Sequence, residues 1–383
     1  NLIILKSTHN MKKICFVVSN SFFANTFLNE PIKILSKHYS VHLICNTENI
    51  DNIKIENPNI KKIFSIRIIR NIAPFRDLVS FIQICQIIRK EKFDVIHTLT
   101  PKAGFLGIIA AYLMKVPNRF HTFTGQVWIS KKGVLKYLLI ALDKIVIKLS
   151  SKIIVDGNSQ KEFLINENLL KKENATVFYN VSTCGINLKK FKPDSKIRKQ
   201  KRLKYNIPYA AKVFLYLGRL NIDKGIEELI EAYLLLNNKN SFLFLVGPME
   251  MDITKELLRN YNLNNIIYIP YTNKPQDILQ LCDVFCFPSH REGFGYSVIE
   301  ASALEKPIIC SDIYGLKYTC IHQKTGLKHK AKSIQSLLQK MAFALAEPKK
   351  MKEMGEMGRT YVSENFSEEK VLKKWEEFYS NFV

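Results

Sequence analysis

DVFCFPSHREGFGYSVIEASAL, residues 283–304, contains a strand, a turn and the start of a helix in one short stretch. The apolar run 284–287 is typical of a buried strand, and the segment from 295 onward has the spacing of an amphipathic helix. Between them, Gly293 and Gly295 let the backbone approach a ligand closely and leave free amides at a helix N-terminus, which favours an anion. The stretch therefore predicts an α/β unit with a ligand site after the strand.

A second strand-turn-helix segment, GRLNIDKG at residues 218–225, lies about seventy residues earlier. Arg219 and Lys224 follow the apolar run 212–217, at the carboxyl end of a strand, where ligand sites of α/β sheets open. A helix N-terminus is an unfavourable place for a cation, because the macrodipole there is positive. One interpretation is two solvent-facing cations, but the pair favours an anionic ligand such as a diphosphate, which Arg binds with two donors and Lys as a point charge.

Together, GR-x4-KG and the later E-x7-E formed by Glu292 and Glu300 resemble the signature of the family-four retaining glycosyltransferases. The resemblance extends from Lys12 to the last expected helix. Two further stretches, HTLTPKAG at 97–104 and RFHTFTGQVW at 119–128, resemble the members that add sugars to lipid-linked precursors of bacterial capsule, O-antigen or related glycans. The resemblance implies the α/β fold called GT-B, in which two Rossmann-like doubly wound domains face a central cleft.

The domain organisation follows from the resemblance and from composition. Residues 1–190 are expected to form an acceptor-binding Rossmann-like domain, and residues 211–365 a nucleotide-sugar-binding one. Residues 191–210 are charged, poor in apolar side chains and contain two prolines, which predicts a linker. By resemblance, residues 366–383 form a helix that returns to the first domain.

Short apolar runs alternate with longer amphipathic stretches, the pattern of parallel strands joined by helices. Strands are predicted at 13–19, 42–46, 95–97, 120–123, 153–156, 176–179, 212–217, 241–246, 266–269, 284–287 and 308–311. Helices are predicted at 26–36, 77–90, 103–114, 135–149, 159–167, 225–235, 254–260, 276–282, 295–304 and 367–382.

The resemblance also implies roles for individual residues. Fixed cations aimed at a leaving nucleoside diphosphate would stabilise the transition state more than the ground state. Glu292 would contact hydroxyls of the donor sugar, Glu300 would contact the ribose, and His121 would lie beside the acceptor and the transferred sugar. The expected catalytic residues are His121, Arg219, Lys224 and Glu292; the donor-binding residues are Gly218, Arg219, Lys224, Gly293, Phe294, Gly295 and Glu300; the acceptor-binding residues are His97 and His121.

The resulting interpretation is a retaining hexosyltransferase that uses a UDP-sugar, of the N-acetylhexosamine or deoxy-hexosamine type. Its acceptor would be a saccharide linked to undecaprenyl diphosphate. No two aspartates are spaced as D-x-D, and cations are available for the diphosphate, so neither a metal ion nor another cofactor is expected. A UDP-sugar 2-epimerase, which shares the architecture, is the nearest alternative.

Charge separates the remaining alternatives. The net charge is +23, with 28 basic and 12 acidic residues in 1–190 against 29 and 22 in 191–383. A basic nucleic-acid-binding protein is a weaker alternative, because no recognisable binding module is present and so no nucleic-acid partner is expected. Residues 128–152 mix large apolar side chains with lysines, as either an interfacial helix or an ordinary buried helix with solvated lysines does. A cytoplasmic protein held peripherally on the inner face of the cytoplasmic membrane, against anionic headgroups, is the favoured interpretation.

Overall fold

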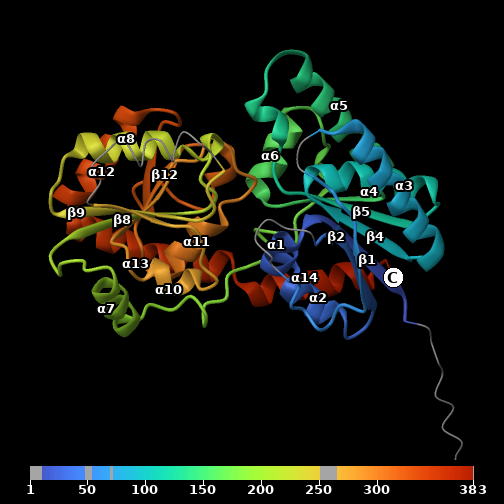
Figure 1. Ribbon diagram of the computed structural model, residues 1–383, viewed down its shortest axis with the longest axis horizontal. Helices are drawn as coiled ribbons and strands as arrows, with labels where there is room; N and C mark the ends of the chain where they lie inside the picture. Colours follow the sequence, from blue (N-terminus) through green and yellow to red (C-terminus); the bar gives the residue numbers. More distant parts are fainter. Residues whose placement is uncertain (1–10, 48–53, 70–71, 251–264, 383) are drawn as a thin grey trace, which may run out of the picture. The chain divides into compact units, whose positions relative to one another are not determined.

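The computed structural model describes residues 11–47, 54–69, 72–250 and 265–382, and these form two compact units (Figure 1). The first unit contains the described residues up to Asp156, then Leu164–Cys184 and the chain from Lys370 onward. The second contains Gly157–Phe163 and Gly185–Glu369. Each unit has one sheet, and every strand pairing between the described strands is parallel. The predicted α/β class is confirmed.

The sheet of the first unit has seven strands in the order β3-β2-β1-β4-β5-β6-β7. Its central strands are continuous apolar runs, as expected for parallel strands that are covered on both faces. The strands are β1 (Lys13–Asn20), β2 (Ser40–Asn46), β3 (Lys62–Ser65), β4 (Val95–Leu99), β5 (Asn118–Phe123), β6 (Lys152–Val155) and β7 (Ala175–Thr176).

Helices cover both faces of this sheet (Figure 1). On one face, Cys15 and Ile96 pack in a core with residues of α3 (Pro74–Glu91) and α4 (Pro101–Leu113), and α4 also contacts α5 (Gly133–Leu149). On the other face, the Phe16 ring lies against Trp375 of α14 (Glu368–Ser380). The remaining helical segments are α1 (Ser21–Phe23), a π-helical turn (Ala24–Leu28), α2 (Asn29–Leu35) and α6 (Asn158–Asn166).

The sheet of the second unit has the order β10-β9-β8-β11-β12-β13. Figure 1 shows α8 and α12 on one face and α10, α11 and α13 on the other. The strands are β8 (Lys212–Leu217), β9 (Ser241–Val246), β10 (Ile266–Ile269), β11 (Val284–Phe287), β12 (Ile308–Ser311) and β13 (Gly326–His329). The helices are α7 (Ser195–Lys204), α8 (Ile226–Leu236), α10 (Pro275–Leu279), α11 (Tyr296–Ala303), α12 (Ile334–Ala346) and α13 (Pro348–Asn365).

Most predicted elements are present, and five strands of the second unit have the predicted bounds. β3, β13, α7, α12 and α13 were not predicted, and the strand predicted at 176–179 is reduced to Ala175–Thr176. The helix predicted at 254–260 lies outside the described residues.

The unit boundaries differ from the predicted domain boundaries. The main part of the second unit begins at Gly185 rather than after residue 190, and residues 157–163 also belong to the second unit. The segment predicted as a linker, 191–210, instead contains α7, which is capped by the Asp194 side chain. Arg198 and Arg202 of α7 form ion pairs of 2.8 and 3.3 Å with Asp283. The charged residues on which the linker prediction rested therefore attach this helix to the second unit.

Candidate active site

The two segments that carry the sugar-nucleotide signature end on neighbouring strands. GRLNIDKG follows β8, EGFG follows β11, and β8 pairs with β11 in the sheet. From β8 the chain builds the sheet toward β9 and β10, whereas β11 begins the other half, so the strand order reverses between them. Ligands of open α/β sheets bind at this switch point, beyond the carboxyl ends of the strands. The sheet topology thus joins residues that lie far apart in the sequence.

Two glycines allow the loops to approach closely. Gly225 has φ 67°, and a Cβ there would lie 2.2 Å from the Pro288 carbonyl oxygen. Gly247 has φ 135°, and a Cβ there would lie 2.0 Å from the Gly218 carbonyl oxygen. A side chain at Gly225 or Gly247 would therefore push the loops after β8, β9 and β11 apart.

Lys224 and Glu292 form an ion pair in this site. Both side chains are largely buried, with 14% and 13% of their surface exposed. Burial lowers the pKa of Lys224; Glu292 opposes this effect, and the positive charges of Arg219 and Arg291 add to it. Three cations thus influence one another at the predicted diphosphate site, with the predicted sugar-binding carboxylate among them.

Arg219 lies at the rim of the same site. Its guanidinium forms an ion pair of 2.7 Å with Glu250, and the Asn221 side-chain amide donates to the same carboxylate oxygen at 2.9 Å. The Arg219 carbonyl accepts a hydrogen bond from the buried Tyr216 hydroxyl at 2.9 Å. Glu250 was not predicted as a site residue, because no motif links it to the signature.

Two further side-chain pairs connect the loop after β11 to the turn after β8 and to α8. Arg291 forms an ion pair of 2.9 Å with Asp223, and the His290 Nε2 atom lies 2.7 Å from a Glu228 carboxylate oxygen. The His290 amide also donates to the Asp223 carbonyl at 2.8 Å. These contacts hold the residues immediately before Glu292 against the residue immediately before Lys224. None of these four side chains was predicted as a site residue.

The EGFG segment leads into α11. Gly293, Phe294 and Gly295 are buried, and their amides donate no hydrogen bond to any group in the part of the chain that the structure describes. The Phe294 ring packs against Phe366 at 5.3 Å, so its side chain serves the core. Glu300 is half-buried on α11; burial raises its pKa to about 7, and the positive charge of Lys190 opposes the shift.

The two predicted site histidines, His97 and His121, point to opposite faces of the first unit's sheet. His121 on β5 is 2% exposed, its Nδ1 atom lies 2.8 Å from the Thr98 hydroxyl, and it packs directly on Gly104 of α4. His97 on β4 is fully buried, with Tyr379 at 2.6 Å from one ring nitrogen and Thr122 at 2.7 Å from the other. Burial lowers the pKa of each to about 3, so both are neutral.

This placement bears differently on the two predicted roles. Both ring nitrogens of His97 already have protein partners, which favours a packing role beneath α14 over contact with an acceptor. His121 lies near the carboxyl end of β5, at the edge of the sheet where ligand sites open. Its predicted role in catalysis stays a prediction.

Comparison with known families and proteins identifies the kind of enzyme. Residues 197–361 match the family described as "Glycosyl transferases group 1", and residues 13–157 match "Glycosyl transferase 4-like". The chain is 32% identical over 321 residues to the capsular polysaccharide biosynthesis glycosyltransferase CapM of Staphylococcus aureus, covering 82% of this chain and 83% of CapM. The chain belongs to the group 1 glycosyltransferases.

Other relatives of this glycosyltransferase act on lipid-linked saccharides according to their names. It is 30% identical to the N,N'-diacetylbacillosaminyl-diphospho-undecaprenol alpha-1,3-N-acetylgalactosaminyltransferase of Campylobacter jejuni, over 73% of this chain and 75% of the relative. It is 27% identical to the UDP-Gal:alpha-D-GlcNAc-diphosphoundecaprenol alpha-1,3-galactosyltransferase of Escherichia coli, over 99% of both chains.

Solved structures confirm the fold. Sucrose-phosphate synthase from Thermosynechococcus elongatus superposes with a TM-score of 0.79, at 20% identity, over 97% of this chain and 98% of that one. HepE of Anabaena in complex with UDP and glucose gives a TM-score of 0.78, at 18% identity, over 97% and 100% of the two chains. The glycosyltransferase therefore has the predicted GT-B fold, with two Rossmann-like doubly wound domains.

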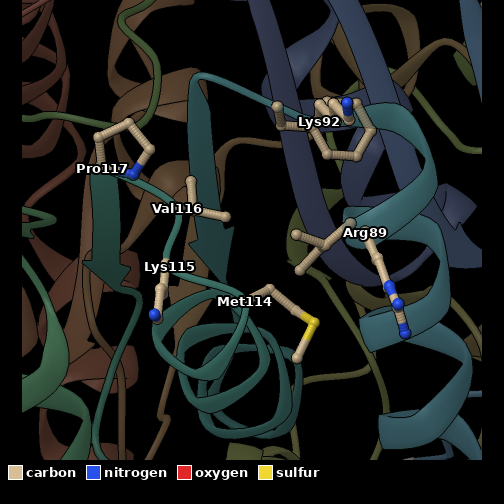
Figure 2. A pocket seen from close by; sticks show the side chains of 8 residues that line it. Arg89, Lys92, Met114, Lys115, Val116 and Pro117 are labelled. Atoms are coloured by element: carbon tan, nitrogen blue, oxygen red, sulfur yellow. The ribbon is translucent and has the colours of Figure 1, made fainter.

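A hollow of about 270 Å³ in the first unit contains none of the predicted site residues (Figure 2). It is formed where α3 and α4 end, next to the amino ends of β4 and β5. Ligand sites of α/β sheets open at the opposite edge, beyond the carboxyl ends of the strands. Figure 2 shows the Lys115 side chain pointing away from Met114, so the cations around the hollow do not converge on one point.

Metal binding has no candidate group among residues 11–47, 54–69, 72–250 and 265–382, where no three His, Cys, Asp or Glu side chains lie together as metal ligands would. Across the same ranges, none of the helices combines the length and the apolar character needed to cross a bilayer. Metal independence of the glycosyltransferase stays a prediction.

Proposed function

We propose that this glycosyltransferase moves a sugar from a UDP-sugar to a saccharide carried on undecaprenyl diphosphate, with retention of configuration and without a metal ion. The donor sugar would be of the N-acetylhexosamine or deoxy-hexosamine type. The names of the Campylobacter and Escherichia relatives support the acceptor class, and the latter also supports a UDP donor.

The observation that carries the proposal is the cation cluster at the switch point of the second sheet. As the bond between the sugar and the diphosphate breaks, negative charge grows on the leaving phosphate. Lys224 and Arg219 would stabilise this charge, and the amides of EGFG would add further donors. The diphosphate would take over the contact that Lys224 now makes with Glu292, which frees this carboxylate for hydroxyls of the donor sugar.

The reaction needs no protein nucleophile. The acceptor hydroxyl oxygen would bond to the anomeric carbon on the face that the diphosphate leaves, and its proton would pass to the departing phosphate oxygen. Retention of configuration follows from this same-face exchange. A water-poor site would suppress hydrolysis of the donor, which is the competing reaction.

The acceptor class implies work at a membrane surface. The first half of the chain carries most of the net charge, with 28 basic against 12 acidic residues in 1–190. Anionic headgroups attract such a surface. We therefore include peripheral association with an anionic membrane in the proposal.

Isothermal titration with UDP and with GDP, in buffer containing EDTA, tests the donor site. Selective binding of UDP is expected, and Lys224→Ala should lower both the affinity for UDP and the turnover, the latter by a factor of about 10² or more. Lys349→Ala, which removes an exposed lysine of the same unit, is the matched control and should leave both unchanged. Equal UDP binding and turnover in the wild type and Lys224→Ala would sink the assignment of the phosphate site.

Product analysis tests the reaction itself. The enzyme should convert a UDP-sugar only when a diphosphate-linked saccharide is present, and NMR of the product should show the anomeric configuration of the donor. Epimerisation of the UDP-sugar without an acceptor would instead support the alternative function, and an inverted product would refute retention.

A further inference from the structure

Helix α3 presents an apolar stripe to solvent. Phe75, Leu78, Val79 and Ile82 are 88%, 56%, 56% and 47% exposed, and their spacing of three and four residues places them on one side of the helix. The opposite side, with Ile84 and Ile88, is buried in the core. An amphipathic helix normally turns polar side chains to water, so α3 has two apolar faces, one of which lacks cover.

Helix α5 also exposes apolar side chains to solvent. Val134, Tyr137 and Leu138 are 86%, 71% and 50% exposed, and Ile145, about two turns further along the stripe, is 40% exposed. Val146 is the only residue of α5 that is buried. The helix therefore lies on the unit without being absorbed into its core.

The chain that contains α5 is rich in basic residues. Between Asp94 and Asp156 the sequence contains nine lysines and arginines and one acidic residue, Asp143. The Asp143 carboxylate is held against the unit, where it accepts a hydrogen bond of 2.9 Å from the indole of the buried Trp128. On α3, Asp77 is paired with Lys102 at 2.7 Å.

The two helices begin at the same edge of the sheet. α3 precedes β4 and α5 precedes β6, so both helices run opposite to the parallel strands and begin at their carboxyl ends. α4 contacts both helices and lies between them (Figure 1). Phe75 and Val134, in the first turns, therefore flank the edge where β4 and β5 end.

We propose that the first halves of α3 and α5 form a bipartite docking surface that inserts into the interface of an anionic phospholipid bilayer. Phe75, Val79, Val134 and Tyr137 would enter the boundary between headgroups and acyl chains, and Lys131 and Lys132 would contact lipid phosphates. Apolar side chains combined with lysines fit this partner, and the carboxylates of Asp77 and Asp143 are engaged by Lys102 and Trp128. A second copy of the chain fits less well, because it would bring the same lysines against these.

This surface deepens the proposed function, and it rests on a lipid-linked acceptor being the substrate. Docking at the carboxyl edge of the first sheet would bring the loops after β4 and β5, including the segment around His121, to the membrane where a lipid-borne saccharide projects. Electrostatic adsorption alone would not need the apolar stripes. The proposal therefore predicts that binding has an insertion component that salt does not remove.

Sedimentation of the full chain with vesicles of phosphatidylglycerol and phosphatidylcholine tests the surface. The variants Phe75→Ser/Val79→Ser and Val134→Ser/Tyr137→Ser should each weaken binding about ten-fold or more, because each removes two inserted apolar groups. Tyr209→Ser/Leu235→Ser is the matched control, because these apolar side chains of the second unit are 101% and 62% exposed. The control should bind as the wild type does.

Lys131→Gln/Lys132→Gln should weaken binding to phosphatidylglycerol vesicles and reduce its dependence on salt. Unchanged vesicle binding in both serine variants would overturn the proposal. A wild-type dimer that the serine variants dissociate, without vesicle binding by either form, would assign the surface to a second copy and overturn it equally.

A failure of the docking surface can be told apart from a failure of the proposed reaction. The serine variants should bind UDP as the wild type does, and should keep their activity on an acceptor carrying a short water-soluble chain in place of the lipid. Their activity on the lipid-linked acceptor in vesicles should fall with vesicle binding. Lys224→Ala should behave in the opposite way, with normal vesicle binding and little activity on either acceptor.

Discussion

Asp223 and Arg291 flank the two residues most closely tied to the proposed chemistry. Asp223 precedes Lys224, Arg291 precedes Glu292, and their ion pair of 2.9 Å holds the two loops together. Neither needs to touch the donor for this pair to set the separation of the ammonium and the carboxylate. We therefore assign both as positioning residues, because a small misplacement of reacting or binding groups lowers rates strongly.

Asp223→Asn and Arg291→Met should each lower kcat by about ten-fold, because the loops that carry Lys224 and Glu292 lose the ion pair that joins them. The exchanged variant Asp223→Arg/Arg291→Asp should recover part of kcat. A much larger loss for Arg291→Met than for Asp223→Asn, without recovery in the exchanged variant, would show that Arg291 acts on the ligand directly.

Glu300 gives a pH dependence whose sign is fixed by its environment. Burial raises its pKa from 4.5 to about 7, so the folded protein holds this proton more tightly than the unfolded chain does. The stabilisation from the proton is complete below pH 4.5 and is lost as the pH rises through 7. Glu300→Gln, which stays neutral, should therefore gain stability relative to the wild type as the pH rises.

Urea unfolding of both proteins at pH 5 and at pH 8 measures this effect. The difference in the free energy of unfolding should move in favour of Glu300→Gln by on the order of 1–3 kcal/mol between the two pH values. If Glu300 also binds the donor ribose as a carboxylate, UDP affinity of the wild type should rise over the same range and that of the variant should not. A constant stability difference would mean that Glu300 titrates as an ordinary exposed glutamate.

At the scale of the elements, the central strands were the most predictable. β8, β9 and β11 are continuous apolar runs closed by glycine, proline or polar residues, and such runs have few other stable arrangements in a protein of this size. β3 and β13 were missed for physical reasons. β3 is a largely exposed edge strand, and β13 is short and begins with a glycine.

The candidate site was only partly predictable for a related reason. A motif marks residues that are close in sequence, and Arg219, Lys224 and Glu292 were found in this way. The partners Glu250 and Asp223 become visible only when β8, β9 and β11 are placed side by side. His97 was predicted as an acceptor-binding residue from a motif in the same way. The alternation of side chains along β4 directs it instead to the face of the sheet that α14 covers.

Gly104 of α4 packs against His121, which is predicted to bind the acceptor. A Cβ at Gly104 would lie 2.3 Å from the Cε1 atom of His121, so Gly104→Ala must displace the imidazole or the helix. The variant should lose about 1–3 kcal/mol of stability and lower activity on the acceptor, while UDP affinity stays unchanged. Chemical denaturation and a UDP titration measure these quantities.

Gly358→Ala is the control for this substitution. Gly358 is a buried glycine of α13, and a Cβ there would meet its nearest neighbour at 3.5 Å, which is ordinary contact. This change should be neutral or stabilise the protein by up to about 1 kcal/mol, because alanine favours a helix over glycine. Equal effects of the two alanines would contradict the close packing of His121 on α4.

At the scale of the whole molecule, the chain passes into the second unit at Gly157 and at Gly185, and returns to the first at Leu164 and at Lys370. The segments next to Gly185 and Glu369 are paired just inside the second unit. The Ile186 amide donates to the Phe366 carbonyl at 2.7 Å, the Glu368 amide donates to the Ile186 carbonyl at 3.2 Å, and Asn187 donates to the Glu368 carboxylate at 2.8 Å. This pairing fixes where both passages begin.

Gly185→Ala tests whether this pairing matters to the molecule as a whole. A Cβ at Gly185 would lie 2.5 Å from backbone atoms of Glu368, and backbone cannot move aside as a flexible side chain can. The paired segments must separate, so the variant should lose about 2 kcal/mol or more in the free energy of unfolding. Because Arg219, Lys224 and Glu292 lie elsewhere in the second unit, UDP affinity of the folded variant should stay within about two-fold of the wild type. Titration with UDP and urea unfolding separate these effects, and a parallel loss of UDP affinity would show instead that the second unit itself is disrupted.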